Sequence, residues 1–524
     1  METKSTVTIL YTSDVHGNAM PIVYGTNEKA DLGLAKYATV VKNAKMHEKN
    51  LVIIDNGDLI QGTPFMTHYV KHRKDQINPM IDIMNTLELD AAVLGNHEFN
   101  FGQAILTDAV RTAQFPFLSA NTIDTHTNAP LFGKPYIIKQ FENGVKAAIV
   151  GVTTHFIPNW ESPEHLEGIH FTDAYETLQT WVTHIHQNEA PDIVIAAYHG
   201  GFERDIETGN ETERQTGENQ AYRMCQDIDG IDVLLTGHQH RTLTGVVNGV
   251  TVIQPGSNGV YYGEVTIHLE KDANGWAIHE KHANIHSLDG VPADQHIIKR
   301  IQPSEAATQT WLDEPVGYVE GDMTISDPFQ ARISKHPFIE LIQKIQMDAA
   351  NVDISVTALL SNESRGFSNN VTMRDIVSNY IYPNTFVVLS LTGTDIKAAL
   401  EKSATYFTRD ENGTLCVNPE FMEPKPQHYN YDMWEGIDYV INVSKPVGSR
   451  IESITYHGHP LERDQHYHVV LNNYRAGGGG NYDMFKDKPI VKDIQRDAVE
   501  LIQRYFETHK TIQAQCTDNF KVVT

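Results

Sequence analysis

The chain has 524 residues, and at about 150 residues per domain this length predicts roughly two to four domains. Hydrophobic residues make up 40% and charged residues 21%, which is ordinary for a globular protein and excludes collagen-like, coiled-coil and disordered chains. The net charge of −26 repels nucleic-acid backbones and anionic lipids. We therefore expect neither a nucleic-acid polymer nor a membrane as a partner.

The three cysteines, Cys225, Cys416 and Cys516, are odd in number and far apart, so they predict neither a disulfide framework nor a CxxC zinc site. No apolar run approaches the roughly 18 residues that span a bilayer. Residues 1–5 lack a basic segment, and the apolar run 7–11 is too short for a signal peptide. The sequence as written predicts a cytoplasmic monomer, with export or a cell-surface location as the alternative if a leader was removed.

Short apolar runs alternate with helical patterns in the first half of the chain. The runs are residues 7–11, 51–54, 91–94, 147–150, 193–197 and 233–235. Apolar residues at helical spacing mark 31–47 and 174–186, and alternating polarity over 262–269 predicts an exposed strand. Strands that alternate with helices predict a layered α/β domain in which part of the sheet is buried on both faces.

Residues 300–335 carry scattered prolines and glycines and predict a transition between domains. A helix with proline at its first position is predicted over 337–350. Strand-like runs at 386–391, 439–443 and 468–471 and helices over 394–404 and 492–508 follow. The predicted fold class is α/β, with a layered βαβ sandwich domain over residues 1–325 and a smaller mixed α/β domain over residues 326–524.

Polar side chains of the metal-ligand type follow five of the predicted strands. They are Asp14, His16, Asp58, Asn96, His199, His238 and His240. In open α/β sheets, ligands bind beyond the carboxyl ends of the strands, so these side chains are expected to meet at one edge. Each has an ordinary alternative when taken singly: Asp58 as a helix cap, Asn96 as a turn residue, and His199 or His238 as a hydrogen-bonded core histidine. Together they predict a metal site.

Carboxylate, imidazole and amide ligands suit Mn²⁺, Zn²⁺, Fe²⁺ or Co²⁺ better than the all-oxygen sites of Ca²⁺. Seven candidate ligands exceed the need of one tetrahedral ion and predict two ions that share a carboxylate. Two ions about 3.5–4 Å apart hold the attacking and leaving oxygens of a phosphoryl centre and lower the pKa of a bridging water. His97, beside Asn96, is left for the role of general acid toward the departing alcohol.

The motifs DVHGN, NGDLIQG, GNHEFNFG, YHGG and GHQH, in this order between residues 14 and 240, resemble the calcineurin-like metallophosphoesterases. Three motifs of the second region, at 382–393, 431–439 and 471–480, resemble the C-terminal substrate-binding domain of the bacterial 5′-nucleotidase family. Within that family, NHEFNFG, DMWEG and NNYRA are more similar to the 2′,3′-cyclic-nucleotide 2′-phosphodiesterase/3′-nucleotidase branch. The resemblance covers nearly the whole chain.

The resemblance implies a role for each candidate. One ion is expected on Asp14, His16, Asp58 and His240, and the other on Asn96, His199 and His238, with Asp58 as the bridge. His97 is implied as the catalytic acid that also contacts phosphate. Asn100 departs from the 5′-nucleotidases, which have aspartate three residues after this histidine. Asparagine can hold an imidazole by a hydrogen bond but does not stabilise its cation, which favours the cyclic-phosphodiesterase branch.

The resemblance also implies substrate-binding residues in the second domain. Tyr431 and Tyr474 are similar to the aromatic pair that stacks on a nucleotide base, and Arg365 is similar to an arginine that forks onto phosphate or ribose oxygens. Tyr431 has sheet packing as its alternative, and Arg365 a solvated surface position. The glycines at 477–480 after Tyr474 either let a flat ligand approach or form a plain flexible loop.

We therefore expect a dinuclear phosphoesterase that opens 2′,3′-cyclic nucleotides and then dephosphorylates the 3′-nucleotide. A metal-bridging hydroxide is expected to attack phosphorus, while His97 protonates the leaving ribose oxygen. The alternatives are a 5′-nucleotidase or nucleotide-sugar hydrolase with the same apparatus, and a weakly catalytic nucleotide-binding sensor.

Overall fold

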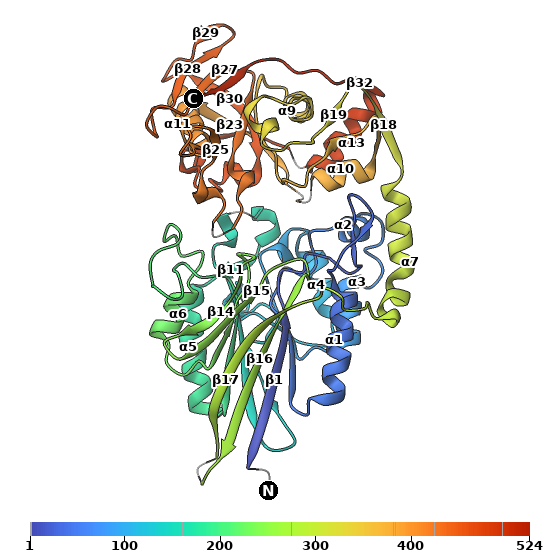
Figure 1. The fold of residues 1–524 in the computed structure, drawn as a ribbon, viewed down its shortest axis with the longest axis vertical. Coiled ribbons are helices and arrows are strands. Elements are labelled where there is room, and N and C mark those ends of the chain that lie inside the picture. Colours follow the sequence, from blue (N-terminus) through green and yellow to red (C-terminus); the bar gives the residue numbers. More distant parts are fainter. Residues whose placement is uncertain are drawn as a thin grey trace. The chain divides into compact units, whose positions relative to one another are not determined.

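The computed structural model describes residues 3–159, 161–273, 275–380, 382, 384–423, 425–494 and 496–524; Pro383, in the motif at 382–393, lies outside them. The chain forms two compact units, residues 1–308 and 309–524, and each is described by itself (Figure 1). The sequence predicts the domain limit later in the chain, between 325 and 326.

Two six-stranded sheets form the first unit. The first sheet has the order β17-β16-β1-β4-β5-β6, with β1 Lys4–Thr12, β4 Leu51–Asp55, β5 Ala91–Val93, β6 Phe117–Leu118, β16 Tyr261–Lys271 and β17 Trp276–Ser287. The second has the order β14-β15-β13-β12-β10-β9, with β9 Tyr136–Gln140, β10 Lys146–Thr153, β12 Ile193–His199, β13 Val233–Leu235, β14 Thr242–Val247 and β15 Val250–Pro255.

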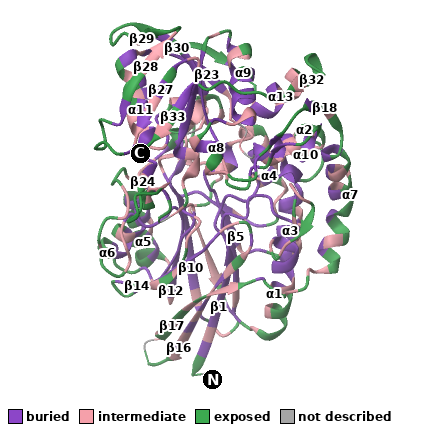
Figure 2. Cartoon of the chain, turned by 45° about the horizontal axis from the view of Figure 1, so that its top comes forward, coloured by how far each residue is buried: buried purple, intermediate pink, exposed green. Residues whose placement is uncertain are grey.

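The two sheets share one apolar core, and helices cover the second sheet from its other side. Ile149 of β10 and Ile9 of β1 belong to the core cluster that joins the sheets. Because strand side chains alternate between faces, Val150 points the other way and packs with Leu178 and Met224. Every residue of β5 and β12 is buried, as the purple strands of Figure 2 indicate. The predicted layered α/β domain with a sheet buried on both faces is confirmed.

The helices that lie between these strands in sequence are α1 Leu34–His47, α2 Pro64–His72, α3 Pro79–Leu87, α4 Gln103–Thr112, α5 Ala174–Asn188 and α6 Ala221–Asp227. Helix α7 Gln295–Leu312 follows the last strand and extends past residue 308, where the first unit ends. The division between the two units, after residue 308, falls within the segment 300–335 that the sequence marks as a transition, and the part of this segment up to Leu312 is helical. Helix α7 continues through Pro303 because it buries Ile297, Ile301 and Leu312 on one side. Among the described residues, no helix is both long and apolar enough to cross a membrane.

The second unit is a mixed α/β structure, as predicted. Its five-stranded sheet has the order β26-β20-β30-β23-β31, with β20 Ile354–Ala358, β23 Phe386–Thr392, β26 Asp432–Glu435, β30 His466–Asn472 and β31 Ile490–Ile494. Smaller sheets contain β18 Pro315–Glu320, β22 Asn370–Thr372, β32 Thr511–Gln513, β27 Asp438–Asn442, β28 Ile451–Tyr456, β29 His459–Pro460 and β33 Phe520–Val523. The helices are α8 Gln330–Ile333, α9 Pro337–Ala350, α10 Met373–Asn379, α11 Gly393–Ala404, α12 Asn473–Ala476 and α13 Ala498–Thr508.

The predicted helix over 492–508 is wrong at its beginning. Residues up to Ile494 belong to β31, which pairs with β23 in antiparallel register. Helix α13 starts only at Ala498, where the Asp497 side chain accepts a hydrogen bond from the Glu500 backbone N–H at 2.7 Å. An aspartate in this position caps the first turn, and the backbone hydrogen bonds before it go to the sheet instead.

Candidate dinuclear metal centre

The carboxyl ends of parallel strands position the candidate ligands. Strands β1, β4 and β5 run parallel in one sheet, and β10, β12, β13 and β15 run parallel in the other. The loops after β1 and β4 are tied together, because Asp14 N–H donates to Gly57 O at 2.9 Å and His16 N–H donates to Asp58 O at 2.8 Å. The sequence motifs at two strand ends thus form one hydrogen-bonded unit.

Five of the seven predicted ligands have left-handed backbone conformations. Asp14, His16, Asp58, His238 and His240 have φ values between 50° and 67°. Residues other than glycine seldom adopt positive φ, and such conformations gather at functional sites where the surrounding structure holds them. The tight turns direct the side chains of neighbouring loops toward one region.

Glu98 anchors the turn that carries Asn96 and His97, and the sequence interpretation missed it. Its buried carboxylate accepts backbone hydrogen bonds from Asp58 at 2.7 Å and from Gly95 at 2.6 Å. Gly95 allows this close approach, because a Cβ there would lie 2.2 Å from Asp58 Oδ1. Its place in the NHEF motif is the signal that could have identified this residue. Glu98 therefore links the loop after β4 to the loop after β5.

Asp14, His16 and His240 form the first group of candidate ligands, with one atom of each within 4.8 Å of the others. His240 Nε2 lies 3.4 Å from Asp14 Oδ1 and 3.0 Å from His16 Nε2. His16 Nδ1 faces the Gln61 carbonyl at 3.1 Å, so Nδ1 carries the hydrogen and Nε2 presents a lone pair. Metal-ligating histidines are held in this way through their second nitrogen.

Asp58, His199 and His238 form the second group, and Asn96 lies among them. His199 Nε2 is 3.2 Å from Asp58 Oδ2 and 3.2 Å from Asn96 Oδ1, while its Nδ1 faces the Asn56 carbonyl at 2.7 Å. His238 Nδ1 is 2.9 Å from Asn96 Oδ1. The lone pair of His199 therefore faces other acceptor oxygens, an arrangement that a cation among them stabilises.

The charges at this centre fit a divalent cation. Burial lowers the pKa of His16 to about 3, which leaves the imidazole in the neutral form that ligates metals. Burial also acts to lower the pKa of His199, but the Asp58 and Asp14 carboxylates outweigh it and raise the pKa to about 10. In the absence of a cation, a proton on His199 compensates these carboxylates, and a metal ion would supply the same positive charge.

Asp58 faces both groups of candidate ligands, and Glu218, outside the groups, holds one ligand in place. Asp58 Oδ2 is 4.0 Å from His16 Nε2 as well as 3.2 Å from His199 Nε2, so one carboxylate oxygen faces both groups. Glu218 accepts from His238 Nε2 at 2.9 Å and so supports the ligand from behind. Glu218 lies in no motif identified from the sequence.

His97 lies beside this centre. Its ring centroid is 5.2 Å from that of His16, and its backbone N–H donates to Asp58 Oδ1 at 2.7 Å. Its Nδ1 lies 2.6 Å from Asn100 Oδ1, and the Asn100 amide donates to Glu161 Oε2 at 2.7 Å. The structure thus brings the predicted pair His97 and Asn100 together and adds Glu161, which the sequence interpretation missed because it lies 61 residues further along the chain.

The three predicted substrate residues of the second unit have different surroundings. Tyr431 is fully buried, with its ring stacked on Tyr406 at 5.0 Å, so it presents no face to a base in this arrangement. Arg365 is exposed. Tyr474 is half-buried, and its ring packs on Gly479, where a Cβ would lie 2.5 Å from it. The glycine thus makes room for the protein's own tyrosine.

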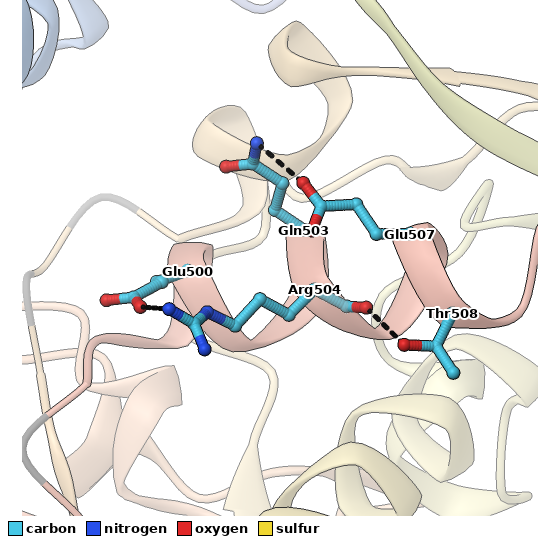
Figure 3. A pocket seen from close by; sticks show the side chains of 5 residues that line it. All are labelled: Glu500, Gln503, Arg504, Glu507 and Thr508. Atoms are coloured by element: carbon cyan, nitrogen blue, oxygen red, sulfur yellow. Dashed lines mark hydrogen bonds and ion pairs between the residues drawn. The ribbon is translucent and has the colours of Figure 1, made fainter.

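A hollow of about 490 Å³ lies along α13 and is lined by Glu500, Gln503, Arg504, Glu507 and Thr508 (Figure 3). Arg504 pairs with Glu500 at 2.9 Å, and Gln503 donates to Glu507 at 3.4 Å. These side chains all come from one helix and bond to each other. The hollow contains none of the predicted site residues.

Comparisons with known proteins agree with this geometry. The calcineurin-like phosphoesterase profile matches residues 7–242, and the 5′-nucleotidase C-terminal domain profile matches residues 315–487. A Staphylococcus aureus protein assigned as a 5′-nucleotidase, solved with α-ketoglutarate, is 35% identical, with a TM-score of 0.91 over 99% of this chain and 100% of that one. This chain belongs to the 5′-nucleotidase family. It is a metal-dependent phosphoric ester hydrolase of the calcineurin-like type.

Other members of the family have more specific names. A 2′,3′-cyclic-nucleotide 2′-phosphodiesterase/3′-nucleotidase from Salmonella typhimurium is 27% identical over 90% of this chain and 81% of its own. The trifunctional nucleotide phosphoesterase YfkN of Bacillus subtilis is 28% identical over 98% of this chain. The chain spans 39% of the length of that Bacillus protein.

Proposed function

We propose that this chain is a dinuclear phosphoesterase that hydrolyses 2′,3′-cyclic nucleotides at the 2′ bond and then removes the phosphate of the 3′-nucleotide. The observation that carries the proposal is the position of Asp58, whose Oδ2 faces His16 Nε2 at 4.0 Å and His199 Nε2 at 3.2 Å. A carboxylate that faces imidazole groups on both sides is suited to be shared by a pair of divalent ions. Manganese, zinc, iron and cobalt all suit this donor set.

In this proposal, Asp14, His16 and His240 would hold one ion, Asn96, His199 and His238 would hold the other, and Asp58 would contribute to both. When bound, two divalent ions supply a water of lowered pKa for attack on phosphorus and positive charge that binds the phosphate oxygens. As the imidazolium, His97 donates from Nδ1 to Asn100 Oδ1 and carries its second proton at Nε2, from which it gives that proton to the departing ribose oxygen.

The choice of substrate is supported by the names of three relatives and by Asn100. Relatives from Salmonella, Yersinia enterocolitica and Haemophilus influenzae, at 26–27% identity, carry the cyclic-nucleotide phosphodiesterase/3′-nucleotidase name. Asn100 also sets the chain apart from the aspartate-bearing 5′-nucleotidases. Arg365 and Tyr474 are proposed to bind the phosphate or ribose and the base. Tyr431, being buried against Tyr406 and Phe407, is proposed as a packing residue.

A panel of substrates tests the proposal directly. The purified protein with Mn²⁺ is assayed against 2′,3′-cAMP, 3′-AMP, 5′-AMP and a UDP-sugar. We expect the highest kcat/KM with 2′,3′-cAMP and 3′-AMP. A preference for 5′-AMP or the UDP-sugar would contradict the proposed substrate while leaving the dinuclear centre intact, and binding of all four without turnover would indicate a sensor.

A 5′-nucleotidase is the second candidate. It is favoured by the Staphylococcus aureus protein, whose identity to this chain, 35%, is higher than that of the cyclic-phosphodiesterase relatives. The ratio of kcat/KM for 5′-AMP to that for 3′-AMP separates the two candidates in a single preparation.

A further inference from the structure

A continuous line of hydrogen bonds runs from His97 away from the candidate metal centre. His97 Nδ1 meets Asn100 Oδ1 at 2.6 Å, and Asn100 Nδ2 donates to Glu161 Oε2 at 2.7 Å. The other oxygen of Glu161 accepts from the Ser162 backbone N–H at 2.8 Å and lies 2.8 Å from His165 Nδ1. Both carboxylate oxygens are therefore used.

Short helical turns hold the two ends of this line. His97 begins η1 (His97–Phe99) and Asn100 follows it, with Asn100 N–H donating to His97 O at 3.4 Å. Glu161 stands between η2 (Ile157–Asn159) and η3 (Pro163–Leu166), and its backbone N–H donates to Ile157 O at 3.0 Å. Only 7% of the Glu161 side chain is exposed, although its segment lies near the surface. The carboxylate is thus turned inward toward Asn100.

The Glu161 carboxylate determines which end of the Asn100 amide faces His97. The two ends of the Asn100 amide have nearly the same shape, but one only donates and the other only accepts. An ionised carboxylate accepts only, so Glu161 binds the NH₂ end and turns Oδ1 toward His97. His97 Nδ1 must then carry the hydrogen, and Nε2 becomes the nitrogen that exchanges a proton with a ligand.

We propose that Glu161 is a positioning residue for the phosphoesterase reaction, which orients the Asn100 amide and through it fixes the tautomer and ring position of His97. The inference rests on the proposed role of His97 as the proton donor. The carboxylate that supports His97 is then Glu161, which acts through Asn100. In the aspartate-bearing 5′-nucleotidases, residue 100 would itself carry the negative charge. A single carboxylate is then needed at the pair Asn100–Glu161, and either position can carry it.

An exchange of the two residues tests this directly. The variants are Glu161→Gln, Asn100→Asp and the double variant, with Glu167→Gln as the control because it removes an exposed carboxylate from the same segment. Each is assayed with Mn²⁺ on 3′-AMP and glycerol 2-phosphate, whose alkoxide leaving groups need a proton, and on p-nitrophenyl phosphate, whose leaving group does not. Metal content and thermal unfolding are measured for every variant.

Each single variant is expected to lose roughly 10- to 100-fold in kcat on the two alkyl phosphates, which is the usual cost of removing a supporting hydrogen bond. The loss on p-nitrophenyl phosphate is expected to be smaller. Glu161→Gln lets the amide of Asn100 turn over, and Asn100→Asp sets two carboxylates against each other. The double variant should recover to within a few-fold of the wild type, because the carboxylate introduced at position 100 then accepts from His97 and from the new glutamine. Additive losses in the double variant, or equal losses on alkyl and aryl substrates, would overturn the proposal.

A measurement without turnover accompanies the kinetics. The ¹⁵N shifts of the His97 ring in the metal-loaded protein are expected to report hydrogen on Nδ1 in the wild type and the double variant, and a mixture of tautomers in Glu161→Gln. An unchanged tautomer in Glu161→Gln would contradict the positioning role. Failure on nucleotides alone, with alkyl and aryl phosphates behaving as expected, would overturn the proposed substrate but leave the role of Glu161 standing.

Discussion

The candidate metal centre of the first unit and the candidate substrate residues of the second differ in how their side chains are placed. In the first, the seven predicted ligands come from five strand ends and lie in two groups. One of them, Asp58, faces histidines of both groups. In the second, Tyr431 is buried, Arg365 is exposed and Tyr474 packs on its own loop. Ligand-type residues at the ends of parallel strands have few other reasons to gather there, whereas an aromatic residue in a motif serves packing as readily as binding.

Removal of the Asp58 carboxylate, which faces both ligand groups, is the strongest test of the candidate metal centre. Asp58→Ala should reduce the metal content from two ions per chain to less than one and lower activity by more than about 10³-fold, since metal ions supply several kcal/mol of charge stabilisation. His240→Ala should weaken mainly one ion, and the exposed Asp229→Ala should change neither quantity. Metal analysis by mass spectrometry decides; two ions on Asp58→Ala would refute the bridging role.

His97 tests whether the proton donor is separate from the ligands. His97→Ala should retain both ions but lose roughly 10²–10⁴-fold in kcat on nucleotides, the usual range for a positioned acid. The loss should be smaller on p-nitrophenyl phosphate, because p-nitrophenolate leaves without a proton. Steady-state kinetics on both substrates provides the check, and equal losses would argue against protonation of the leaving group.

Tyr431 tests the candidate substrate residues of the second unit. Because its side chain is buried, its removal is expected to lower the stability of the protein. Tyr431→Ala removes a ring that stacks on Tyr406 at 5.0 Å and meets Phe407 at 4.9 Å. Loss of a large core aromatic should lower the free energy of unfolding by about 3–5 kcal/mol. Tyr431→Phe keeps the ring and loses only the hydrogen bond to Arg332 O, so it should cost about 0.5–1.5 kcal/mol. A stable Tyr431→Ala protein with a raised KM for nucleotides would restore the base-stacking role.

Tyr474 carries the smallest expected effect. If it stacks on the base, Tyr474→Ala should lose about 1–3 kcal/mol, which raises KM for nucleotides roughly five- to 150-fold. Hydrolysis of bis-p-nitrophenyl phosphate, which has no base, should change little, and Tyr474→Phe should resemble the wild type on both substrates. Parallel loss on nucleotides and on the substrate without a base would assign Tyr474 to the packing of its glycine loop.

Much of the first unit could be predicted because two independent patterns coincide there. Apolar runs of strand length mark β1, β4, β5, β12 and β13, and each ends in or is closely followed by residues of the metal-ligand type. Local pattern failed where long-range pairing decides, as at β31, whose residues join β23 across about a hundred positions. It also failed at α7, where burial of Ile297 and Ile301 outweighs Pro303.

The sequence by itself determined the fold class, the family resemblance and the set of residues able to ligate metal, because these depend on residue type and on order along the chain. Only the tertiary structure decided which side chains support them. Glu98, Glu218 and Glu161 bond to groups that lie 40, 20 and 61 residues away, respectively. A carboxylate has no local signature that separates a buried hydrogen-bond acceptor from a solvated charge, so its partner becomes known only when the folded backbone brings the two together.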